Sequence, residues 1–483
     1  MSTSAELNLR PDYDPLLQQL ADYALDYRVE SVEALDTARL CLMDSLGCAL
    51  LALQVPGCTR LLGPLVAGTQ VPCGARVPGT HYRLDPVKAA WDLGCLIRWL
   101  DFNDTWLAAE WGHPSDNLGA ILAVADHLAQ QQAARGDRPL RMRAVLEAMV
   151  IAYEIQGVLA LENAFNRVGL DHVVLVKLAS CAVSCRLMGA TREQMLAALS
   201  QVFADGQALR VYRHAPNAGS RKSWAAGDAA GRGVFLARLA MQGEMGVPGV
   251  LRAPRWGFHA VSFHGAELIL ARPLGSYVME NILFKVRYPA EFHGQTACEA
   301  AVRLHPQVRN RLHEIRRIVV TTQESAIRII SKSGPLANAA DRDHCLQYMV
   351  TVALLEGDVR AEHYSDAFHS SHPLIDTLRA RTEVMEEPGY SRDYLQADKR
   401  SIANAVQLFF ADGSCSERVE VEYPLGHRRR RVESLSLLDD KFRQALVSQF
   451  SGQRSDQLFA WCHDATRLDE MPVHDFMTNL LPE

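Results

Sequence analysis

A short segment of this chain gathers side chains that could hold or move protons. It contains two carboxylates, a hydroxyl and an imidazole within thirteen residues, between apolar helical patterns at 89–100 and 117–128. These side chains are Asp101, Asp104, Thr105 and His113. Burial between core helices shifts pKa values, so the segment predicts a general acid or base at neutral pH. The structural alternative is that the carboxylates cap helix ends and that His113 is a core residue with its hydrogen bonds satisfied.

Two further segments add an imidazole and cations. Asp171 and His172 stand directly before a predicted helix, which Asp171 could cap while His172 faces a cavity. A loop rich in Gly, Pro and Ser follows, with four groups that are cationic or can become so. These groups are Arg213, His214, Arg221 and Lys222. A packed loop of this composition suits phosphate or polycarboxylate binding, and a solvated basic loop is the alternative.

Other candidates lie farther along the chain. Lys285 lies at the hinge between two predicted domains, shortly before Glu291 and His293. Such junctions favour ligand sites. In the smaller predicted domain, Tyr348 follows His344 by one helical turn. A purely structural role is equally compatible with each of these two groups.

The composition narrows the class of protein. The chain has 483 residues, of which 48% are hydrophobic and 22% charged, and its net charge is −6 at pH 7. This balance is typical of globular proteins with large cores and does not favour nucleic-acid binding. The basic run Arg428–Arg431 is therefore expected to be solvated surface.

Spacing of cysteines and histidines predicts no cofactor. The eleven cysteines form no C-x-x-C pair, which indicates buried thiols in a reducing compartment. The seventeen histidines form no H-E-x-x-H or H-x-x-x-H pair, so we expect neither a metal site nor an iron–sulfur cluster. No basic leader is followed by an apolar stretch, and no apolar run reaches the roughly 20 residues of a membrane span. We therefore expect a cytoplasmic protein without a membrane partner.

Hydrophobic periodicity predicts a mostly α-helical, multi-domain protein. Residues 1–275 are expected to form a large all-helical domain, completed by C-terminal helices within 426–483. Residues 276–425 are expected to form a smaller α+β lid domain. Two signals predict its strands: a β-branched run at 316–322, and a hairpin turn at Asp412–Gly413.

Local signals predict where several helices begin. Pro86 is suited to the first position of a helix, and Thr191 with Gln194 forms a capping-box pattern. Further helices of the large domain are expected over residues 141–162, 173–189, 191–203 and 228–242.

Several long strings of the chain resemble the MmgE/PrpD family. These strings are residues 98–117, 165–172, 212–217, 221–228, 277–281 and 341–345. The resemblance implies a helical domain with an α+β lid, a site between them, a homodimer, and no metal or organic cofactor. It also implies a small tricarboxylate substrate. The implied reaction removes water from 2-methylcitrate to give 2-methyl-cis-aconitate, in the methylcitrate cycle of propionate catabolism, with citrate as a further candidate substrate.

The same family contains cis-aconitate decarboxylases, which are the alternative. Their site residues correspond here to Asp101, Thr105, His113, His172, Lys222 and Tyr348. Near the hinge, a family lysine corresponds to Lys285, and a family histidine to either Glu291 or His293. The spacing before His113 is longer than in the decarboxylase branch and is filled by Glu110-Trp111-Gly112, which favours dehydration.

The implied dehydration needs a base, an acid and cations. A base takes a proton from the carbon next to a carboxylate, an acid protonates the departing hydroxyl, and cations neutralise the developing charge. His113 and His172 are the expected proton-transfer pair, with Asp101 orienting one of them and Tyr348 the candidate donor to the hydroxyl. Which residue is acid and which is base stays open. The other candidates for substrate binding are Thr105, Arg213, His214, Arg221, Lys222, Lys285 and His293.

Overall fold

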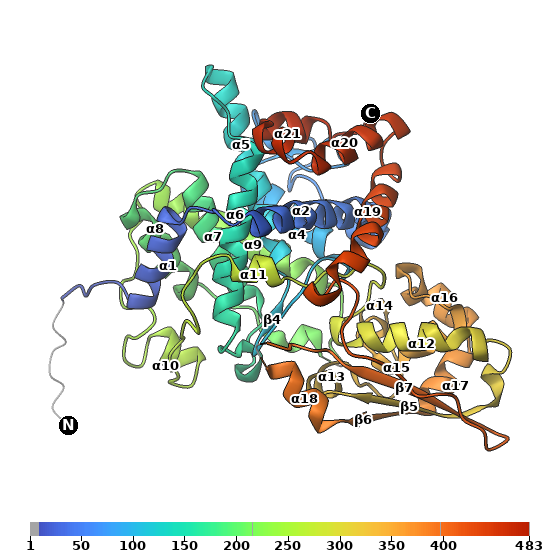
Figure 1. Ribbon diagram of the computed structural model, residues 1–483. Helices are drawn as coiled ribbons and strands as arrows, with labels where there is room; N and C mark the ends of the chain where they lie inside the picture. Colours follow the sequence, from blue (N-terminus) through green and yellow to red (C-terminus); the bar gives the residue numbers. More distant parts are fainter. Residues whose placement is uncertain (1–8, 215, 397, 483) are drawn as a thin grey trace, which may run out of the picture.

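The described residues form a mostly α-helical structure with small sheets (Figure 1). The computed structural model describes residues 9–214, 216–396 and 398–482. The N-terminal residues 1–8, on which the expected absence of a leader rests, lie outside this part, as does Ala215 of the basic loop. Within the described ranges, no helix combines the length and apolarity needed to cross a membrane.

The first half of the chain is helical, as its periodicity predicted. Helix α4 begins at the expected proline, Pro86, and the expected capping box forms between Thr191 and Gln194. The helices are α1 Pro15–Asp26, α2 Val32–Ala52, α3 Pro56–Thr59, α4 Pro86–Arg98, α5 Leu118–Arg135, α6 Met142–Ala160, α7 Val173–Leu187, α8 Arg192–Ala204, α9 Arg221–Met241, α10 Phe258–Ser262 and α11 Tyr277–Asn281. Single 3-10 turns lie at Pro114–Asn117, Phe165–Val168 and Arg210–Arg213.

Glycines let the central helices approach closely. A Cβ atom at Gly94 of α4 would lie 2.7 Å from the Cα of Gly227 on α9, so only a glycine fits there. The two helices run so that the start of α9 meets the end of α4, where the Ser223 hydroxyl donates to the Trp99 carbonyl at 3.3 Å. This packing brings residues near 98 and near 222 into one region.

Helix α9 begins at Arg221, earlier than the expected start at 228. The prediction is wrong because the glycines of this stretch have poor intrinsic helix propensity. Burial of the small side chains against α4 stabilises the helix instead. Arg221 and Lys222 therefore lie on the first turn of a helix, while His214 remains in the preceding loop.

A four-stranded sheet lies in the second half of the chain, with strand order β6-β5-β7-β8. The expected strand is β5 (Ile315–Thr322), and the expected hairpin pairs β7 (Asn404–Phe410) antiparallel with β8 (Val419–Val421). Strand β6 (Thr382–Glu386) pairs parallel with β5 and was not predicted. Its side chains are exposed or half-buried, so it lacks the alternation that identifies a strand in sequence.

Helices α12, α15 and α17 lie along one face of this sheet (Figure 1). The helices of this region are α12 Gln295–Val308, α13 Glu324–Ile330, α14 Ala339–Arg342, α15 Leu346–Glu356, α16 Asp366–Ser371, α17 Leu374–Ala380 and α18 Pro388–Leu395, with 3-10 turns at Phe292–Gly294, Leu312–Glu314 and Ala361–Tyr364. Two further hairpins, in the first half, pair β1 Ala75–Arg76 with β2 Arg83–Leu84, and β3 Trp106–Leu107 with β4 Trp111–Gly112.

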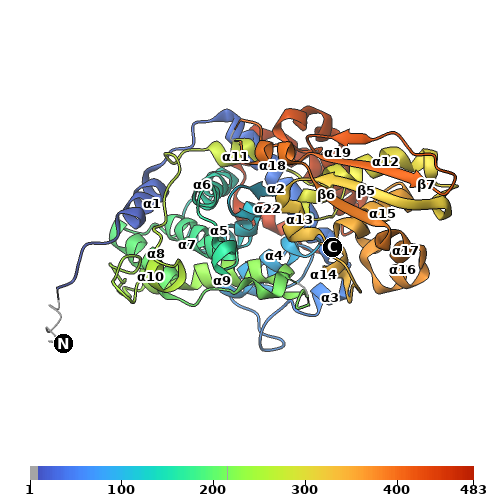
Figure 2. The same ribbon diagram turned by 90° about the horizontal axis from the view of Figure 1, so that it is seen from below.

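Buried hydrophobic side chains form two main clusters. The larger draws its residues from Leu17 to Val286 and again from Leu438 to Leu480. The second draws its residues from Tyr288 to Val421. Figure 2 shows α6, α7 and α9 on one side of the molecule and β5, β6 and α12 on the other. The chain therefore passes from one core to the other near residue 287.

The C-terminal helices contribute buried residues to the first core. Helix α19 (Arg431–Val447) packs along α2, as Figure 1 shows, and is followed by α20 Gly452–His463, α21 Ala465–Glu470 and α22 Val473–Thr478. The preceding basic run is only partly solvated. Arg428 is exposed, but Arg430 pairs with Glu299 at 3.0 Å and Arg431 donates to the Ile282 carbonyl at 2.7 Å. The expectation of a solvated run is therefore wrong for its last two residues.

Lys441 of α19 joins the C-terminal segment to the centre of the molecule. Its Nζ donates to Asp44 Oδ1 and to the Phe102 carbonyl, both at 2.6 Å, and to the Lys285 carbonyl at 2.9 Å.

We expect Lys441→Met to lower the free energy of unfolding by about 3 kcal/mol, because Asp44 loses its buried counter-charge. Urea denaturation measures this loss. Arg443→Met, on the exposed side of the same helix, should cost less than about 1 kcal/mol. Equal losses in the two variants would contradict the prediction.

Candidate active site

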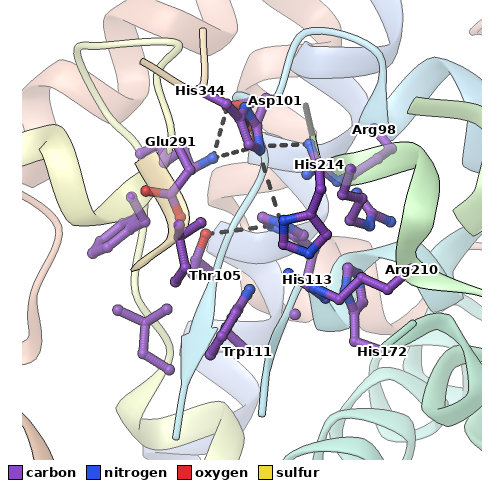
Figure 3. Close-up of a pocket in the computed structure, with 16 residues that line it drawn as sticks. Arg98, Asp101, Thr105, Trp111, His113, His172, Arg210, His214, Glu291 and His344 are labelled. Atoms are coloured by element: carbon purple, nitrogen blue, oxygen red, sulfur yellow. Dashed lines mark hydrogen bonds and ion pairs between the residues drawn. The ribbon is translucent and has the colours of Figure 1, made fainter. Parts of the chain in front are cut away.

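A pocket lies between segments from both halves of the chain, with lining residues from Arg98 to His344 (Figure 3). Its polar lining is Arg98, Asp101, Thr105, His113, His172, Arg210, Arg213, His214, Lys285, Glu291 and His344. The backbone of Thr105 pairs with that of Leu283 in both directions, at 2.8 and 3.1 Å. This bridge fixes the opening segment of the site beside the passage between the two cores.

Asp101 is the electrostatic centre of the pocket. Its Oδ1 accepts hydrogen bonds from Arg98 Nη1 at 2.6 Å and from Lys285 Nζ at 2.5 Å. Two imidazoles flank it: His344 Nδ1 lies 3.7 Å from Oδ2, and His113 Nε2 lies 4.0 Å from Oδ1. These contacts are drawn as dashed lines in Figure 3.

The charge and backbone of Asp101 are both unusual. Burial alone would raise the pKa of its carboxyl, but Arg98 and Lys285 outweigh burial and hold this pKa well below its usual range. Asp101 is therefore ionised at neutral pH. Its φ of 49° lies in the left-handed region, which costs a non-glycine residue about 1 kcal/mol. The ion pairs hold the residue in this conformation.

His113 has a defined tautomer. Its Nδ1 lies 2.6 Å from the Asp104 carbonyl oxygen, which can only accept, so Nδ1 carries the hydrogen and Nε2 has the free lone pair. Burial and the positive charges of Arg98 and Lys285 lower the pKa of this imidazole well below 6.5. His113 is thus a neutral base at neutral pH, with Nε2 on the side of Asp101.

His172 lies beside His113, with 5.9 Å between the ring centroids. Both of its ring nitrogens are buried and have no hydrogen-bond partner among the described residues, although Nδ1 lies 3.3 Å from the Asp171 carboxylate. The absence of a side chain at Gly112 leaves room for this ring, because a Cβ atom there would lie 3.1 Å from His172 Cδ2. The ring is therefore available to an oxygen atom of a bound substrate.

Lys222 lies behind the lining residue His344 and is not itself part of the pocket lining. Its Nζ donates to both carboxylate oxygens of Asp343 at 2.7 Å and lies 3.1 Å from His344 Nδ1. Asp101, Asp343 and His344 also bring possible metal-ligand atoms within 4.8 Å of one another. Because the Lys222 ammonium already bonds two of these three groups, a lysine supplies the cation at this place.

The structure brings some of the expected cations to the pocket and not others. Arg213 lines it but is paired with Asp171, with Nη2 3.1 Å from Oδ1. His214 lies in the lining as an exposed residue. The side chain of Arg221 is 42% exposed and stacks over the Trp224 ring at 4.3 Å, outside the pocket. An expected substrate contact of Arg221 does not fit this position.

Two further candidates lie behind the lining. Glu291 faces the pocket, whereas His293 stands behind it, with Nδ1 2.8 Å from Glu291 Oε1 and Nε2 3.1 Å from the Tyr394 hydroxyl. Tyr348 lies in the second hydrophobic core, and its hydroxyl donates to the His363 carbonyl at 2.8 Å. The expected role of Tyr348 at the leaving hydroxyl does not fit, because the fold already uses this group.

Three ionisable lining residues were not among the predicted site residues. Arg98 precedes Asp101 by three positions, and this helical spacing could have paired them. His344 neighbours Asp343 in a segment that was singled out, although Tyr348 was chosen from it instead. Arg210 has no sequence signal, because an isolated 3-10 turn places it in the pocket.

Glu110, at the edge of the pocket, should make stability depend on pH. Burial raises the pKa of its carboxyl to about 7 from 4.5, with Arg210 opposing the effect. Between these values the unfolded chain loses the proton while the folded chain keeps it, so the carboxyl destabilises the fold increasingly as pH rises. We expect the stability of Glu110→Gln relative to the unsubstituted protein to increase by about 2 kcal/mol from pH 5 to pH 8. Urea denaturation at both pH values checks this, and a constant difference would contradict it.

A helical scaffold that buries imidazoles, carboxylates and cations around one pocket is typical of an enzyme acting on a small anionic molecule. Residues 18–270 match the MmgE/PrpD N-terminal domain, and residues 288–465 match the MmgE/PrpD C-terminal domain. The matches cover most of the chain, which therefore belongs to the MmgE/PrpD family.

Individual relatives are similar along almost their whole length. A 2-methylcitrate dehydratase of Cupriavidus necator is 55% identical over 480 residues, covering 99% of each chain. That of Escherichia coli strain K12 is 53% identical, covering 98% of this chain and 99% of its own. A mitochondrial 2-methylcitrate dehydratase of Yarrowia lipolytica is 51% identical, covering 97% of this chain and 91% of its own.

Proposed function

We propose that this protein is a hydro-lyase that converts 2-methylcitrate to 2-methyl-cis-aconitate and water, in the methylcitrate cycle of propionate catabolism. The names of its relatives support dehydration rather than cis-aconitate decarboxylation. The observation that carries the proposal is the neutral His113, whose free Nε2 lies 4.0 Å from the ion cluster of Asp101. Such a group can take a proton at neutral pH.

In the proposed reaction His113 is the base. Its Nε2 takes the proton from the carbon adjacent to a substrate carboxylate, and the electron pair of that C–H bond forms the new double bond. The C–O bond on the neighbouring carbon breaks, and the hydroxyl leaves with one proton as water. The cations around Asp101 stabilise the negative charge that develops on the carboxylate.

His344 is the proposed source of the proton for the leaving hydroxyl. It lines the pocket, and its Nδ1 lies 2.8 Å from Asp343 Oδ1 and 3.1 Å from Lys222 Nζ. Nδ1 carries the hydrogen when it donates to Asp343, and Nε2 carries it when Nδ1 accepts from the Lys222 ammonium. The second tautomer is the proposed proton donor. A proton given up by His344 can be replaced from Lys222. His172 Nε2, which has no hydrogen-bond partner among the described residues, then serves a substrate oxygen rather than the second proton transfer.

We further propose that the two hydrophobic cores belong to two domains, with the second acting as a lid. The pocket supports this division, because its lining comes from residues on both sides of the passage near residue 287. A homodimer, a cytoplasmic location and the absence of a metal or organic cofactor complete the proposal, on the basis of the family resemblance.

The test is to incubate the purified protein separately with 2-methylcitrate, citrate and cis-aconitate. We expect 2-methylcitrate to give the ultraviolet absorbance of a conjugated product, with citrate dehydrated more slowly. No CO₂ should form from cis-aconitate. Release of CO₂, or no product from 2-methylcitrate, would refute the proposed reaction.

A further inference from the structure

The buried cations of the pocket differ in whether the protein pairs them. Arg98 and Lys285 both bind Asp101, and Arg213 binds Asp171. Arg210 is equally buried, with 5% of its surface exposed, but its Nη1 has no hydrogen-bond partner among the residues that the structure describes. A buried guanidinium nitrogen without a partner is costly, so this donor is suited to a ligand that arrives with a negative charge.

We propose that Arg210 forms a subsite for one carboxylate of the substrate and that Glu110 and Trp111 position it. This inference rests on the proposed function and deepens it. A guanidinium presents its N–H groups in a planar fork that matches a carboxylate. Figure 3 shows Arg210 beside His113 and His172, the residues proposed to act on the substrate.

Two neighbours hold the guanidinium in place without using its donors. It stacks over the Trp111 ring, 4.9 Å from the centroid. Its Nη1 lies 3.6 Å from Glu110 Oε1, which is an ion-pair distance but too long for a hydrogen bond. Glu110 cannot easily come closer, because its Oε2 accepts from the backbone and side-chain amides of Asn166 at 2.6 and 2.8 Å.

This arrangement leaves Arg210 oriented but unsatisfied. The Glu110 carboxyl also has a raised pKa, about 7, so it is only partly ionised at neutral pH and competes weakly for Arg210. Asp101 and Asp171, in contrast, hold their arginines with short hydrogen bonds, from Arg98 Nη1 and from Arg213 Nε. Arg210 is therefore the lining cation whose charge remains free for a substrate carboxylate.

The test compares binding of a tricarboxylate with that of its dicarboxylate fragments. Calorimetry would measure affinity for propane-1,2,3-tricarboxylate, for glutarate, which lacks the central carboxylate, and for methylsuccinate, which lacks a terminal one. We expect Arg210→Gln to weaken tricarboxylate binding about 10- to 100-fold. One of the two dicarboxylates lacks the carboxylate that Arg210 binds. The affinity for that dicarboxylate should be the same in Arg210→Gln as in the unsubstituted protein. The KM for 2-methylcitrate should rise by a similar factor.

Arg328→Gln is the matched control. Arg328 also lies over the Trp111 ring, at 5.4 Å, but its side chain is 36% exposed. This variant should change each affinity by less than about twofold. Arg210→Lys keeps the charge without the fork, and we expect it to recover part of the lost affinity. Arg210→Lys also allows the affinities to be measured if Arg210→Gln does not fold.

Glu110→Gln tests the positioning residue. The substituted amide keeps the shape and an acceptor for Asn166 but no longer attracts Arg210. We expect a rise in KM of several-fold with kcat within about twofold, which a general loss of structure would not produce.

Two results would overturn the inference. One is an unchanged tricarboxylate affinity in Arg210→Gln, and the other is an equal loss for all three acids. Because calorimetry needs no turnover, the inference is tested even if the unsubstituted protein does not dehydrate 2-methylcitrate, a result that would count against the proposed function instead.

Discussion

Replacing His113 with glutamine is expected to lower kcat for 2-methylcitrate about 1,000-fold, because the variant lacks the proposed base. The glutamine amide can still donate to the Asp104 carbonyl that His113 Nδ1 contacts at 2.6 Å, so the local structure should persist. Steady-state kinetics with the purified variant measures the effect. KM should change much less than kcat, since the base acts on the reacting carbon rather than on the carboxylates.

His127→Gln provides the control for this substitution. The Nδ1 of His127 also pairs with a backbone carbonyl, that of Cys73 at 2.8 Å, but outside the pocket. This variant should retain full activity. Activity of His113→Gln within tenfold of the unsubstituted enzyme would remove His113 from the proposed mechanism.

If His113 is the base, its pKa sets how the activity falls at low pH. A base works only when unprotonated, so kcat falls as pH drops below its pKa. Burial with Arg98 and Lys285 lowers the pKa of His113 well below 6.5. Because the Glu110 carboxyl, with a pKa of about 7, also affects KM, the quantity to follow is kcat, which we expect to stay level from pH 8 down to 6.5. A fall centred above pH 6.5 would contradict this assignment.

Asp101→Asn is expected to reduce kcat/KM at least 100-fold and the free energy of unfolding by about 3 kcal/mol. The substitution leaves Arg98 and Lys285 buried without their shared counter-charge. Asparagine tolerates the left-handed conformation that Asp101 adopts, with φ of 49°, so backbone strain should not add to the loss. Kinetics and urea denaturation measure the two effects.

Asp126→Asn separates the two effects of that substitution. Asp126 forms a buried ion pair with Arg76 at 2.5 Å, and neither residue lines the pocket. The Asp126→Asn variant should therefore lose stability but keep its kcat. If Asp101→Asn retained its activity while losing stability in the same way, the carboxylate would have a structural role only.

The stability difference for Asp101→Asn should also depend on pH in a defined direction. The pKa of Asp101 in the folded protein is depressed below its usual value of 3.8, so the stability that this carboxylate contributes is present above the unfolded pKa and is lost as pH falls through the folded one. We expect the free energies of unfolding of Asp101→Asn and the unsubstituted protein to differ by the full amount at pH 7 and by less below pH 4.

Much of the site could be predicted because its residues carry local signals. Asp101, Thr105 and His113 were recognisable as polar groups between two apolar helices, and each lines the pocket. Helix starts at Pro86 and Thr191 were predictable for the same reason, since a proline or a capping pattern acts within one turn.

Other features depended on contacts that no short segment encodes. Helix α9 begins early because its glycines pack against α4, and β6 forms by pairing with β5 despite its exposed side chains. Tyr348 and His344 belong to one segment, yet only the imidazole reaches the pocket, while the phenol is buried in the second core. Their separation follows from how this segment packs.

Periodicity and residue type act locally, so they were enough to predict the helical character, the small sheet region and the stretch from Asp101 to His113. The pairing of the charges could be read only from the folded structure. Arg213, Arg98 and Arg210 are alike in sequence, but the first two meet a carboxylate within hydrogen-bond distance and the third does not. Electrostatic pairing depends on distances between segments far apart in the chain, and folding alone sets those distances.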